Sequence, residues 1–287
     1  MSKLIIITGP TASGKTAEAV RLARQLDTEI ISCDSRQFYR ELDIGVARPS
    51  PDELSSAPHH FIACRSVTQP YNISDFEQDA MGVLERLFLS HTTVVAVGGS
   101  GLYIDALCKG VARMPDPTPE LRSLLQQMPI EEKRARLRLL DPDYYSRVDL
   151  RNPVRLQRAL EVCLMAGRPY SALLAEQQNV CRPFDIEIRV IGTPTSSLLP
   201  LSHEALRQRI DSRVDQMVSS GLVDEVRSVM QYRHLNTLRT VGYSEIFSYL
   251  DGDTSLDDAV AAIKLNTWHY ARKQLTWMRR YVVAAGV

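Results

Sequence analysis

The sequence predicts an α/β fold, in which a parallel β-sheet is flanked by helices and interrupted by an all-helical insertion domain. Between residues 3 and 110, short β-branched runs alternate with stretches of helical period, as in parallel strands joined by right-handed crossovers. No strand pattern occurs between residues 115 and 183, and one returns at Ile186–Ile191. We therefore expect an α/β core, residues 1–114 and 184–287, and a helical insertion, residues 115–183.

The N-terminal part of the core contains four expected strands, each a short run of β-branched or apolar residues. They are Leu4–Thr8, Glu29–Cys33, His60–Cys64 and Thr93–Val97. Helices are expected at Lys15–Leu26 and Asp75–Leu89. Ser74 and Glu77 have the spacing of a capping box at the start of the second helix.

Proline marks the entry to the insertion and the start of its helices. Three pairs place a capping residue before a proline, which suits the first helical position: Thr118-Pro119, Asp141-Pro142 and Asn152-Pro153. The third helix is expected to end at Gly167. Beyond residue 200 the pattern is helical, at Leu201–Ser219, Leu222–Tyr232, Val241–Leu250 and Leu256–Tyr281.

Composition and charge exclude several classes of protein. The chain has 287 residues, and its 34 Lys and Arg residues balance its 34 Asp and Glu residues, so a surface for nucleic acid must be a local patch. No apolar run approaches the roughly 18 residues of a transmembrane helix, and the N-terminus lacks the layout of a signal peptide. Five scattered cysteines without a C-x-x-C pair indicate reduced thiols. We expect a cytoplasmic protein with no membrane partner.

Residues 9–16, GPTASGKT, fit the phosphate-loop pattern G-x-x-x-x-G-K-[S/T] and follow an expected strand. In this pattern backbone N–H groups surround an oxyanion, the lysine adds a positive charge and the last hydroxyl is placed to ligate Mg²⁺. The motif predicts a sheet like that of P-loop NTPases and a phosphorylated ligand. The predicted phosphate-binding residues are Gly9, Pro10, Thr11, Ala12, Ser13, Gly14, Lys15 and Thr16, with Thr16 as metal ligand.

Two other strand ends should meet this loop, because ligands bind at the carboxyl ends of parallel strands. Asp34 follows the second strand and could accept a proton or help to hold Mg²⁺; it could also merely cap the turn that follows. The cluster Gly98–Gly101 follows the fourth expected strand. Its N–H groups and the Ser100 hydroxyl could reach an oxyanion, or its glycines could serve tight packing.

Two arginines on the expected helix Leu201–Ser219 are further candidates. Arg209 and Arg213 lie four residues apart, beside an apolar stripe, so both could reach phosphate from the same side. Solvation at the surface is an equally good explanation.

In these segments, and in others along almost the whole chain, the sequence resembles the tRNA dimethylallyltransferases, also called tRNA isopentenyltransferases. The phosphate loop alone is not specific, but the ordered combination of motifs is. The matching segments are GPTASGKT at 9–16, DSRQFYR at 34–40, DIGVARP at 43–49, PHH at 58–60, GGSGLYIDALCKG at 98–110, RNPVRLQRALEV at 151–162, RIDSRVDQMVSSGLVDEV at 209–226, LRTVGYSEIFSYL at 238–250 and YARKQLTWMRR at 270–280.

The resemblance implies transfer of a dimethylallyl group from its diphosphate to N6 of the adenosine beside the anticodon of a tRNA. By position it implies Asp34 as the base, Thr16 as the magnesium and phosphate contact, and Lys15, Ser100 and Arg213 around the diphosphate. The residues that match tRNA-contacting segments are Asp34, Ser35, Arg36, Gln37, Ser100, Arg122, Gln157, Arg158, Ala159, Leu160 and Glu161. Ser100 stands where the family commonly has threonine, and the hydroxyl is retained.

The implied partners are tRNA, gripped at its anticodon arm by the insertion, and dimethylallyl diphosphate, with Mg²⁺ as cofactor and a monomeric enzyme. One alternative is prenyl transfer to free adenine nucleotides, which would need no insertion to hold an anticodon arm. Another is a small-molecule kinase using the same loop for ATP, although the sequence shows no arginine-rich lid between glycine hinges.

Overall fold

The structure is a computed structural model that describes residues 2–176, 181–196 and 198–282. The chain forms two compact units, Met1–Cys108 with Pro183–Val287, and Lys109–Arg182. The sequence placed the insertion at 115–183, so the boundary before it lies six residues earlier in the structure. Within the described residues no helix combines the length and the apolar character needed to cross a membrane.

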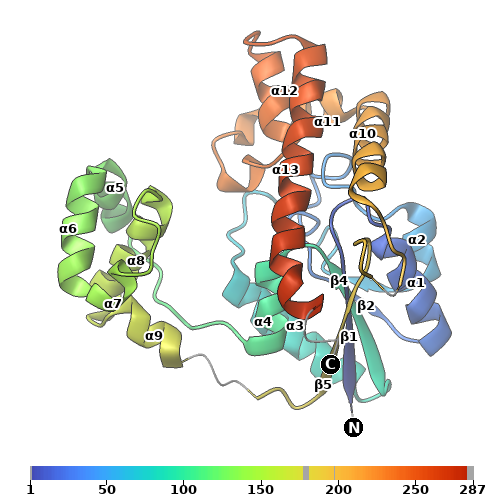
Figure 1. The fold of residues 1–287 in the computed structure, drawn as a ribbon, viewed down its shortest axis with the longest axis horizontal. Coiled ribbons are helices and arrows are strands. Elements are labelled where there is room, and N and C mark those ends of the chain that lie inside the picture. The colour runs from blue at the N-terminus through green and yellow to red at the C-terminus, as the bar shows by residue number, and fades with distance from the viewer. Residues whose placement is uncertain (1, 177–180, 197, 283–287) are drawn as a thin grey trace. The chain divides into compact units, whose positions relative to one another are not determined.

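The first unit is built on a five-stranded parallel sheet in the order β3-β2-β4-β1-β5 (Figure 1). The strands are β1 (Lys3–Thr8), β2 (Ile30–Ser32), β3 (His59–His60), β4 (Thr93–Gly98) and β5 (Asp185–Val190). β1 pairs with β4 and with β5, so the chain rejoins the sheet after the insertion, as predicted. All pairings are parallel, which confirms the predicted fold class.

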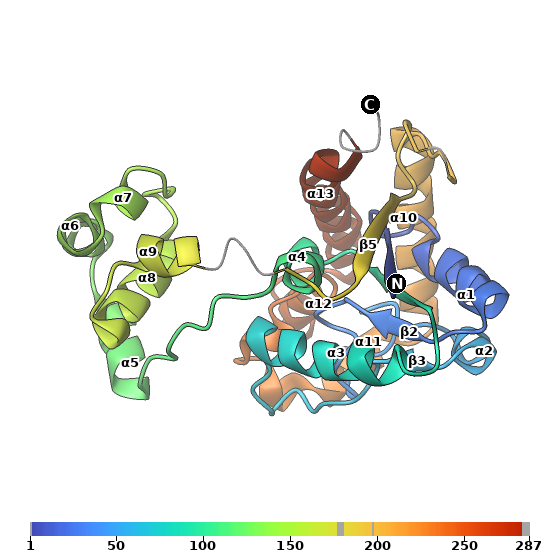
Figure 2. The same ribbon diagram turned by 90° about the horizontal axis from the view of Figure 1, so that it is seen from below.

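Alternating side chains of β1 explain why helices cover both faces of the sheet. Leu4 and Ile6 belong to a core that includes residues of α3 (Ile73–Leu87) and α4 (Gly101–Lys109). Ile5 and Ile7 face the opposite way and pack with residues of α1 (Lys15–Leu26). A strand buried on both faces reads as a continuous apolar run, as β1 does. Figure 2 shows α1 and α3 on opposite sides of the strands.

Three local expectations for the core needed correction. The third strand spans only His59–His60 instead of His60–Cys64, and positive φ angles at Phe61 and Ala63 bend the chain after it. The capping box of α3 is formed by Asn72 and Asp75, not by Ser74 and Glu77. A short helix, α2 (Pro51–Ser56), was not anticipated, although Ser50 and Pro51 give it the cap-then-proline signature.

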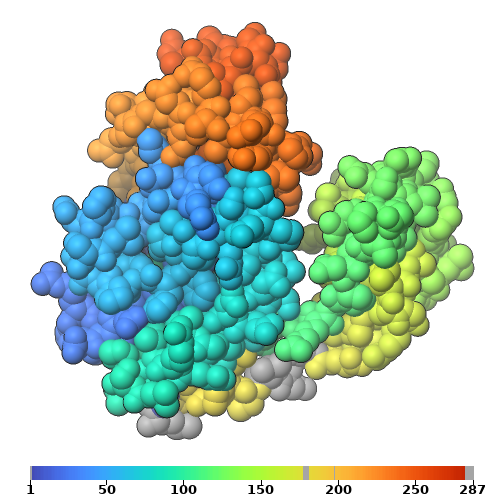
Figure 3. All heavy atoms as spheres, turned by 180° about the vertical axis from the view of Figure 1, so that it is seen from behind, coloured from blue at the N-terminus to red at the C-terminus, as the bar shows by residue number. Residues whose placement is uncertain are grey.

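The C-terminal segment forms a helical layer of the first unit. It contains α10 (His203–Ser219), α11 (Leu222–Ser228), the 3-10 turns η1 (Met230–Tyr232) and η2 (Asn236–Leu238), α12 (Tyr243–Leu250) and α13 (Leu256–Val282). The expected helix Leu222–Tyr232 is therefore divided into α11 and η1. Figure 3 shows α10 to α12 in orange, next to the blue and cyan surface of the α/β core.

The second unit is all helical, with its own apolar core around Leu125, Leu137, Leu156 and Leu160. Thr118, Asp141 and Asn152 cap their helices as the sequence predicts, and Gly167 ends α8 in the left-handed region at φ 63°. No separate start signal was identified in the sequence for α6 or α9. Its helices are α5 (Pro119–Gln127), α6 (Ile130–Leu140), α7 (Pro142–Tyr145), α8 (Pro153–Ala166) and α9 (Tyr170–Glu176).

Candidate phosphate-binding and catalytic site

A cavity of about 490 Å³ lies at the carboxyl edge of the sheet in the first unit. The phosphate loop after β1 and the segment after β2 contribute to its wall, as the strand order requires. The C-terminal layer closes it with residues of α10, the turn before α12, and α13. The polar residues used below that line it are Thr11, Lys15, Thr16, Asp34, Arg36, Gln37, Arg213, Tyr270 and Gln274.

The phosphate loop has the backbone geometry that its glycines permit. Gly14 adopts φ 88°, a left-handed conformation, at the N-cap of α1. A Cβ on Gly9 would lie 2.6 Å from Ser13 Oγ and 2.7 Å from the Ile191 carbonyl, so no side chain fits there. Of the eight predicted phosphate-binding residues, Gly9, Pro10 and Ser13 are buried behind the cavity wall, and the other five line it.

Lys15 is the cationic group of this loop. Its Nζ donates to the Pro10 carbonyl at 3.3 Å. Burial lowers the pKa of Lys15 to about 8; Asp34 partly opposes that shift, and the positive charge of Arg213 adds to it. The protein by itself therefore does not fully compensate the positive charge of Lys15, and an anion bound in the cavity would complete the compensation.

Asp34 stands where β2 ends, and it faces the same cavity as Lys15. Its Oδ1 accepts the Arg36 N–H at 3.0 Å, so Asp34 does cap the turn that follows it. Capping uses one carboxylate oxygen and leaves the side chain among the cavity residues, so the capping role is compatible with a role as base or metal ligand. Ser35 N–H donates to Ser100 Oγ at 3.3 Å, which joins this turn to the start of α4.

The Gly98–Gly101 cluster is explained by packing. A Cβ on Gly99 would lie 2.3 Å from Gln274 Nε2, and one on Gly101 would lie 2.4 Å from the Trp277 ring. A Cβ on Gly98 would meet the Cys33 carbonyl at 2.6 Å. Ser100 is not among the cavity-lining residues, and its hydroxyl contacts Ser35 and Tyr270. Of the two explanations left open by the sequence, tight packing accounts for the three glycines.

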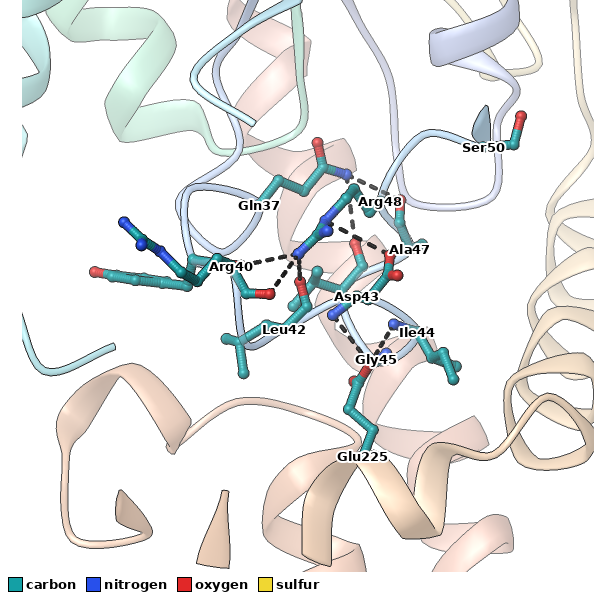
Figure 4. A network of polar contacts seen from close by, with 12 residues as sticks. Gln37, Arg40, Leu42, Asp43, Ile44, Gly45, Ala47, Arg48, Ser50 and Glu225 are labelled. Carbon is teal, nitrogen blue, oxygen red and sulfur yellow. Dashed lines mark hydrogen bonds and ion pairs between the residues drawn. The ribbon is translucent and has the colours of Figure 1, made fainter. Parts of the chain in front are cut away.

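The loop of residues 39–49 is held from both sides (Figure 4). Glu225 accepts the N–H groups of Asp43, Ile44 and Gly45 at 3.0, 2.7 and 2.9 Å. Arg48 donates to three carbonyls of the same loop, those of Tyr39, Arg40 and Leu42. These hydrogen bonds pair backbone N–H and C=O groups of the loop and hold it in place.

This fixed loop determines how Gln37 presents its amide. Gln37 Nε2 donates to the Ala47 carbonyl at 2.9 Å, and Ser32 Oγ donates to Gln37 Oε1 at 3.2 Å. The carbonyl group and the NH₂ group of the amide therefore each point in a defined direction within the cavity wall (Figure 4). Such an amide can distinguish a donor from an acceptor on a ligand.

The two arginines of α10 are separated by the structure. Arg213 lines the cavity with Lys15, and burial lowers its pKa. Arg209 lines another hollow, of about 360 Å³, with Ser13, Gly14 and Arg21. The expectation that both reach phosphate from one side is therefore not met, because one helical turn places them on different sides of the phosphate loop.

The cavity offers oxygen ligands suited to Mg²⁺. The Thr16 hydroxyl and the Asp34 carboxylate both line it, and hard cations prefer such oxygens together with water and phosphate. Among the described residues no group of three or more His, Cys, Asp and Glu side chains could hold a metal without a ligand's help. The Thr16 hydroxyl and the Asp34 carboxylate therefore fit Mg²⁺ only together with oxygen atoms from water or a bound ligand.

In the second unit, Glu161 is the centre of the predicted tRNA-contacting group. Its side chain is 6% exposed; Gln157 donates to it at 2.9 Å, and Arg122 and Arg158 lie 3.9 and 3.7 Å away. Ala159 and Leu160 are completely buried in the core of this unit. Their side chains therefore belong to the packing of α8, and the solvent-accessible part of the motif consists of the exposed Arg122 and the half-buried Gln157 and Arg158.

Sequence reasoning missed several residues that shape the cavity. Glu225 and Tyr243 fix the loop beside Gln37, and Gln274 bridges two loops. The sequence did contain a hint of their importance, because all three residues lie within the motif segments 209–226, 238–250 and 270–280. Spacing alone could not reveal contacts that span more than 170 residues.

A phosphate loop at the end of β1, a carboxylate just after β2 and a buried arginine in one cavity are the features of a protein with a P-loop-like fold. The chain belongs to the IPP transferase family, whose model matches residues 37–281.

Curated relatives cover nearly the full chain. One is tRNA dimethylallyltransferase 1 of Bacteroides thetaiotaomicron, 47% identical over 98% of this chain and 89% of that protein. Another is tRNA dimethylallyltransferase of Christiangramia forsetii, 43% identical over 96% of this chain and 90% of that protein.

Solved structures give the same fold. The tRNA isopentenylpyrophosphate transferase of Bacillus halodurans is 31% identical, with a TM-score of 0.67, and the match covers 97% of this chain and 87% of that one. A eukaryotic dimethylallyltransferase acting on tRNA, 24% identical, matches in fold with a TM-score of 0.81 over 97% of this chain and 70% of its own.

Proposed function

We propose that the protein transfers a dimethylallyl group from dimethylallyl diphosphate to N6 of the adenosine immediately 3′ of the anticodon in tRNA. The observation that carries the proposal is the single cavity in which Lys15, Thr16 and Arg213 meet Asp34. Lys15, Thr16 and Arg213 suit a diphosphate, and Asp34 offers a base in the same cavity. Relatives that are 43–47% identical over nearly the whole chain are named for this reaction.

In the proposed reaction the bond between C1 of the allyl group and the diphosphate oxygen breaks, and its electron pair leaves with the diphosphate. The N6 lone pair forms the new C1–N bond, and the N6 proton passes to Asp34. Lys15, Arg213 and the loop N–H groups stabilise the negative charge that grows on the leaving oxygens. Asp34 raises the nucleophilicity of the amine by taking its proton as the bond forms.

Thr16 would hold a magnesium ion, which would neutralise further charge on the diphosphate and leave Asp34 to act as the base. Gln37, fixed by Ser32 and Ala47, would read the polar edge of the flipped adenine. Ser35, Arg36 and Ser100 lie beside Asp34 and would contact the neighbouring nucleotides. Arg122, Gln157 and Arg158, organised by Glu161, would bind the anticodon arm.

We propose that the protein acts as a monomer in the cytoplasm, with tRNA and dimethylallyl diphosphate as its substrates. The anticodon arm would bind to the second unit, Lys109–Arg182, which a prenyltransferase of free nucleotides would not need. Phosphate-loop proteins otherwise bind nucleoside triphosphates, so the donor must be tested directly.

The test is incubation with radiolabelled dimethylallyl diphosphate, Mg²⁺ and one of three acceptors. These are an unmodified tRNA transcript, the same transcript with guanosine replacing the adenosine 3′ of the anticodon, and AMP. Label only in the first acceptor supports the proposal. Label in AMP but not in tRNA would replace it with free-nucleotide transfer, and ATP-dependent phosphorylation without prenyl transfer would replace it with a kinase.

A further inference from the structure

Gln274 is a buried polar side chain that is hydrogen-bonded to two loops of the candidate site. It lies on α13 and is 6% exposed. Its Oε1 accepts the Thr11 N–H at 2.9 Å, and its Nε2 donates to the Gly99 carbonyl at 2.9 Å. One amide thus bridges the phosphate loop and the turn that follows β4.

The bridge requires an amide at this position. Only a group with both an acceptor and a donor satisfies an N–H and a C=O that face each other across a gap. The gap is tailored to it, since a Cβ on Gly99 would lie 2.3 Å from Gln274 Nε2. Buried polar groups that are fully paired in this way rigidify their surroundings.

The two loops that the bridge joins carry the two halves of the site. Thr11 belongs to the loop that contains Lys15. Gly99 precedes Ser100, whose hydroxyl accepts the Ser35 N–H beside Asp34. A chain of direct contacts therefore runs from the phosphate loop through Gln274 to the turn that holds the carboxylate.

We propose that Gln274 is a positioning residue that sets the distance between the phosphate loop and Asp34. Resting on the proposed function, this inference adds that the amide aligns C1 of the bound diphosphate donor with the amine that Asp34 deprotonates. The Thr11 N–H is engaged by Gln274, so the diphosphate is bound by the loop groups that remain. Loss of the bridge then impairs alignment more than diphosphate affinity.

The test compares Gln274→Leu, which keeps the volume but removes both hydrogen bonds, with Gln274→Glu, which keeps the acceptor for Thr11 and places a second oxygen against the Gly99 carbonyl. We expect kcat for transfer to tRNA to fall about 10- to 100-fold in Gln274→Leu, since misalignment by an ångström has effects of this size. The Kd for inorganic diphosphate should change about twofold or less. Gln78→Leu, an exposed glutamine on α3, is the matched control and should equal wild type.

A second arm uses Gly99→Ala, whose Cβ displaces the amide. In the wild-type background it should lower kcat as Gln274→Leu does. In a Gln274→Ala background it should add much less, because the space taken by Nε2 is then open and only the Gly9 carbonyl remains close, at 3.3 Å. Additive losses in the double variant would contradict the bridge.

A third arm does not depend on catalysis. Inorganic diphosphate should slow amide hydrogen exchange in peptides that contain Thr11 and, through the bridge, in those that contain Gly99 and Ser100. In Gln274→Leu the second protection should disappear and the first should remain. Protection of both peptides in the variant would overturn the inference, as would wild-type kcat or a parallel loss of kcat and diphosphate binding. A wild-type protein that transfers nothing to tRNA but shows the transmitted protection would count against the proposed function and in favour of the bridge.

Discussion

The Tyr243 hydroxyl donates a 2.5 Å hydrogen bond to Glu225 Oε1, the same carboxylate that accepts three backbone N–H groups of the loop beside the cavity. The contact joins α12 to α11, and through Glu225 it joins both helices to residues 43–45. Burial and the neighbouring carboxylate raise the pKa of Tyr243, so the phenol remains a donor at every physiological pH. The tyrosine ring also packs on Gly45, where a Cβ would lie 2.6 Å from it.

Removal of the Glu225 carboxylate should destabilise the first unit more than removal of the phenol. Tyr243→Phe breaks one hydrogen bond to a charged acceptor and should lower the free energy of unfolding by about 1.5–3 kcal/mol. Glu225→Ala also leaves the three N–H donors without this acceptor and should cost about 3–5 kcal/mol. Urea unfolding measures both effects.

The control for these variants is Asp224→Asn, next to Glu225 on α11. Asp224 is exposed and pairs with Arg227 within its own helix, so its loss should cost about 1 kcal/mol or less. If Asp224→Asn and Glu225→Ala lowered the free energy of unfolding equally, the hydrogen bonds from Glu225 to the loop would contribute nothing to stability.

Asp34→Asn should lower kcat about 10²- to 10⁴-fold, the usual contribution of a positioned general base. The amide keeps the size of the side chain and can still accept the Arg36 N–H, so the turn should be preserved. Diphosphate affinity should change little, which stopped-flow or equilibrium binding of inorganic diphosphate can check. A parallel loss of affinity would instead assign Asp34 mainly to holding the metal.

Local sequence patterns predicted where much of this site lies. The run Leu4–Ile7 followed by GPTASGKT fixed the place of the phosphate loop, because strand, turn and helix are encoded by neighbouring residues. Asp34 was foreseen because the ends of parallel strands share one edge of the sheet. The capping prolines of the second unit were equally local signals.

Contacts made across the chain were not foreseen. Gly99 and Gly101 have the look of an anion-binding cluster in sequence, but their lack of side chains makes room for Gln274 and Trp277. Arg209 and Arg213 share a helical face by spacing, yet the phosphate loop passes between their cavities. In each case the residue that determines the role lies far away in the sequence. Tertiary packing therefore determines the role of these residues, which sequence spacing alone does not.

Binding of inorganic diphosphate should depend on the charge of Lys15, whose pKa burial lowers to about 8. The lysine is charged below pH 8 and loses its charge as the pH rises through that value. The affinity advantage of wild type over Lys15→Met should therefore be full at pH 7 and should shrink above pH 8. Calorimetry in two buffers of different ionisation enthalpy should show proton uptake on binding near pH 8.5.

The same lysine should affect stability with the opposite sign. Its pKa is lower in the folded state than its ordinary value of 10.5, so between about pH 8 and 10.5 the unfolded chain binds more protons. The contribution of Lys15 is thus unfavourable below pH 8 and is relieved as the pH rises. Lys15→Met should unfold at a higher urea concentration than wild type at pH 7, and the difference should narrow by pH 10.

The arginines organised by Glu161 should contribute to tRNA binding through phosphates. Arg122→Ala and Arg158→Ala should each weaken tRNA binding and each reduce the slope of log K against log salt by about 1. Glu161→Gln removes the charge that holds both arginines, so it should raise the KM for tRNA and leave the KM for dimethylallyl diphosphate unchanged. Arg138→Ala, an exposed arginine on α6 of the same unit, is the control. If Arg138→Ala lowered the salt slope as much as Arg122→Ala, the attraction would be a diffuse effect of net charge, and the group around Glu161 would not be the tRNA-contacting surface.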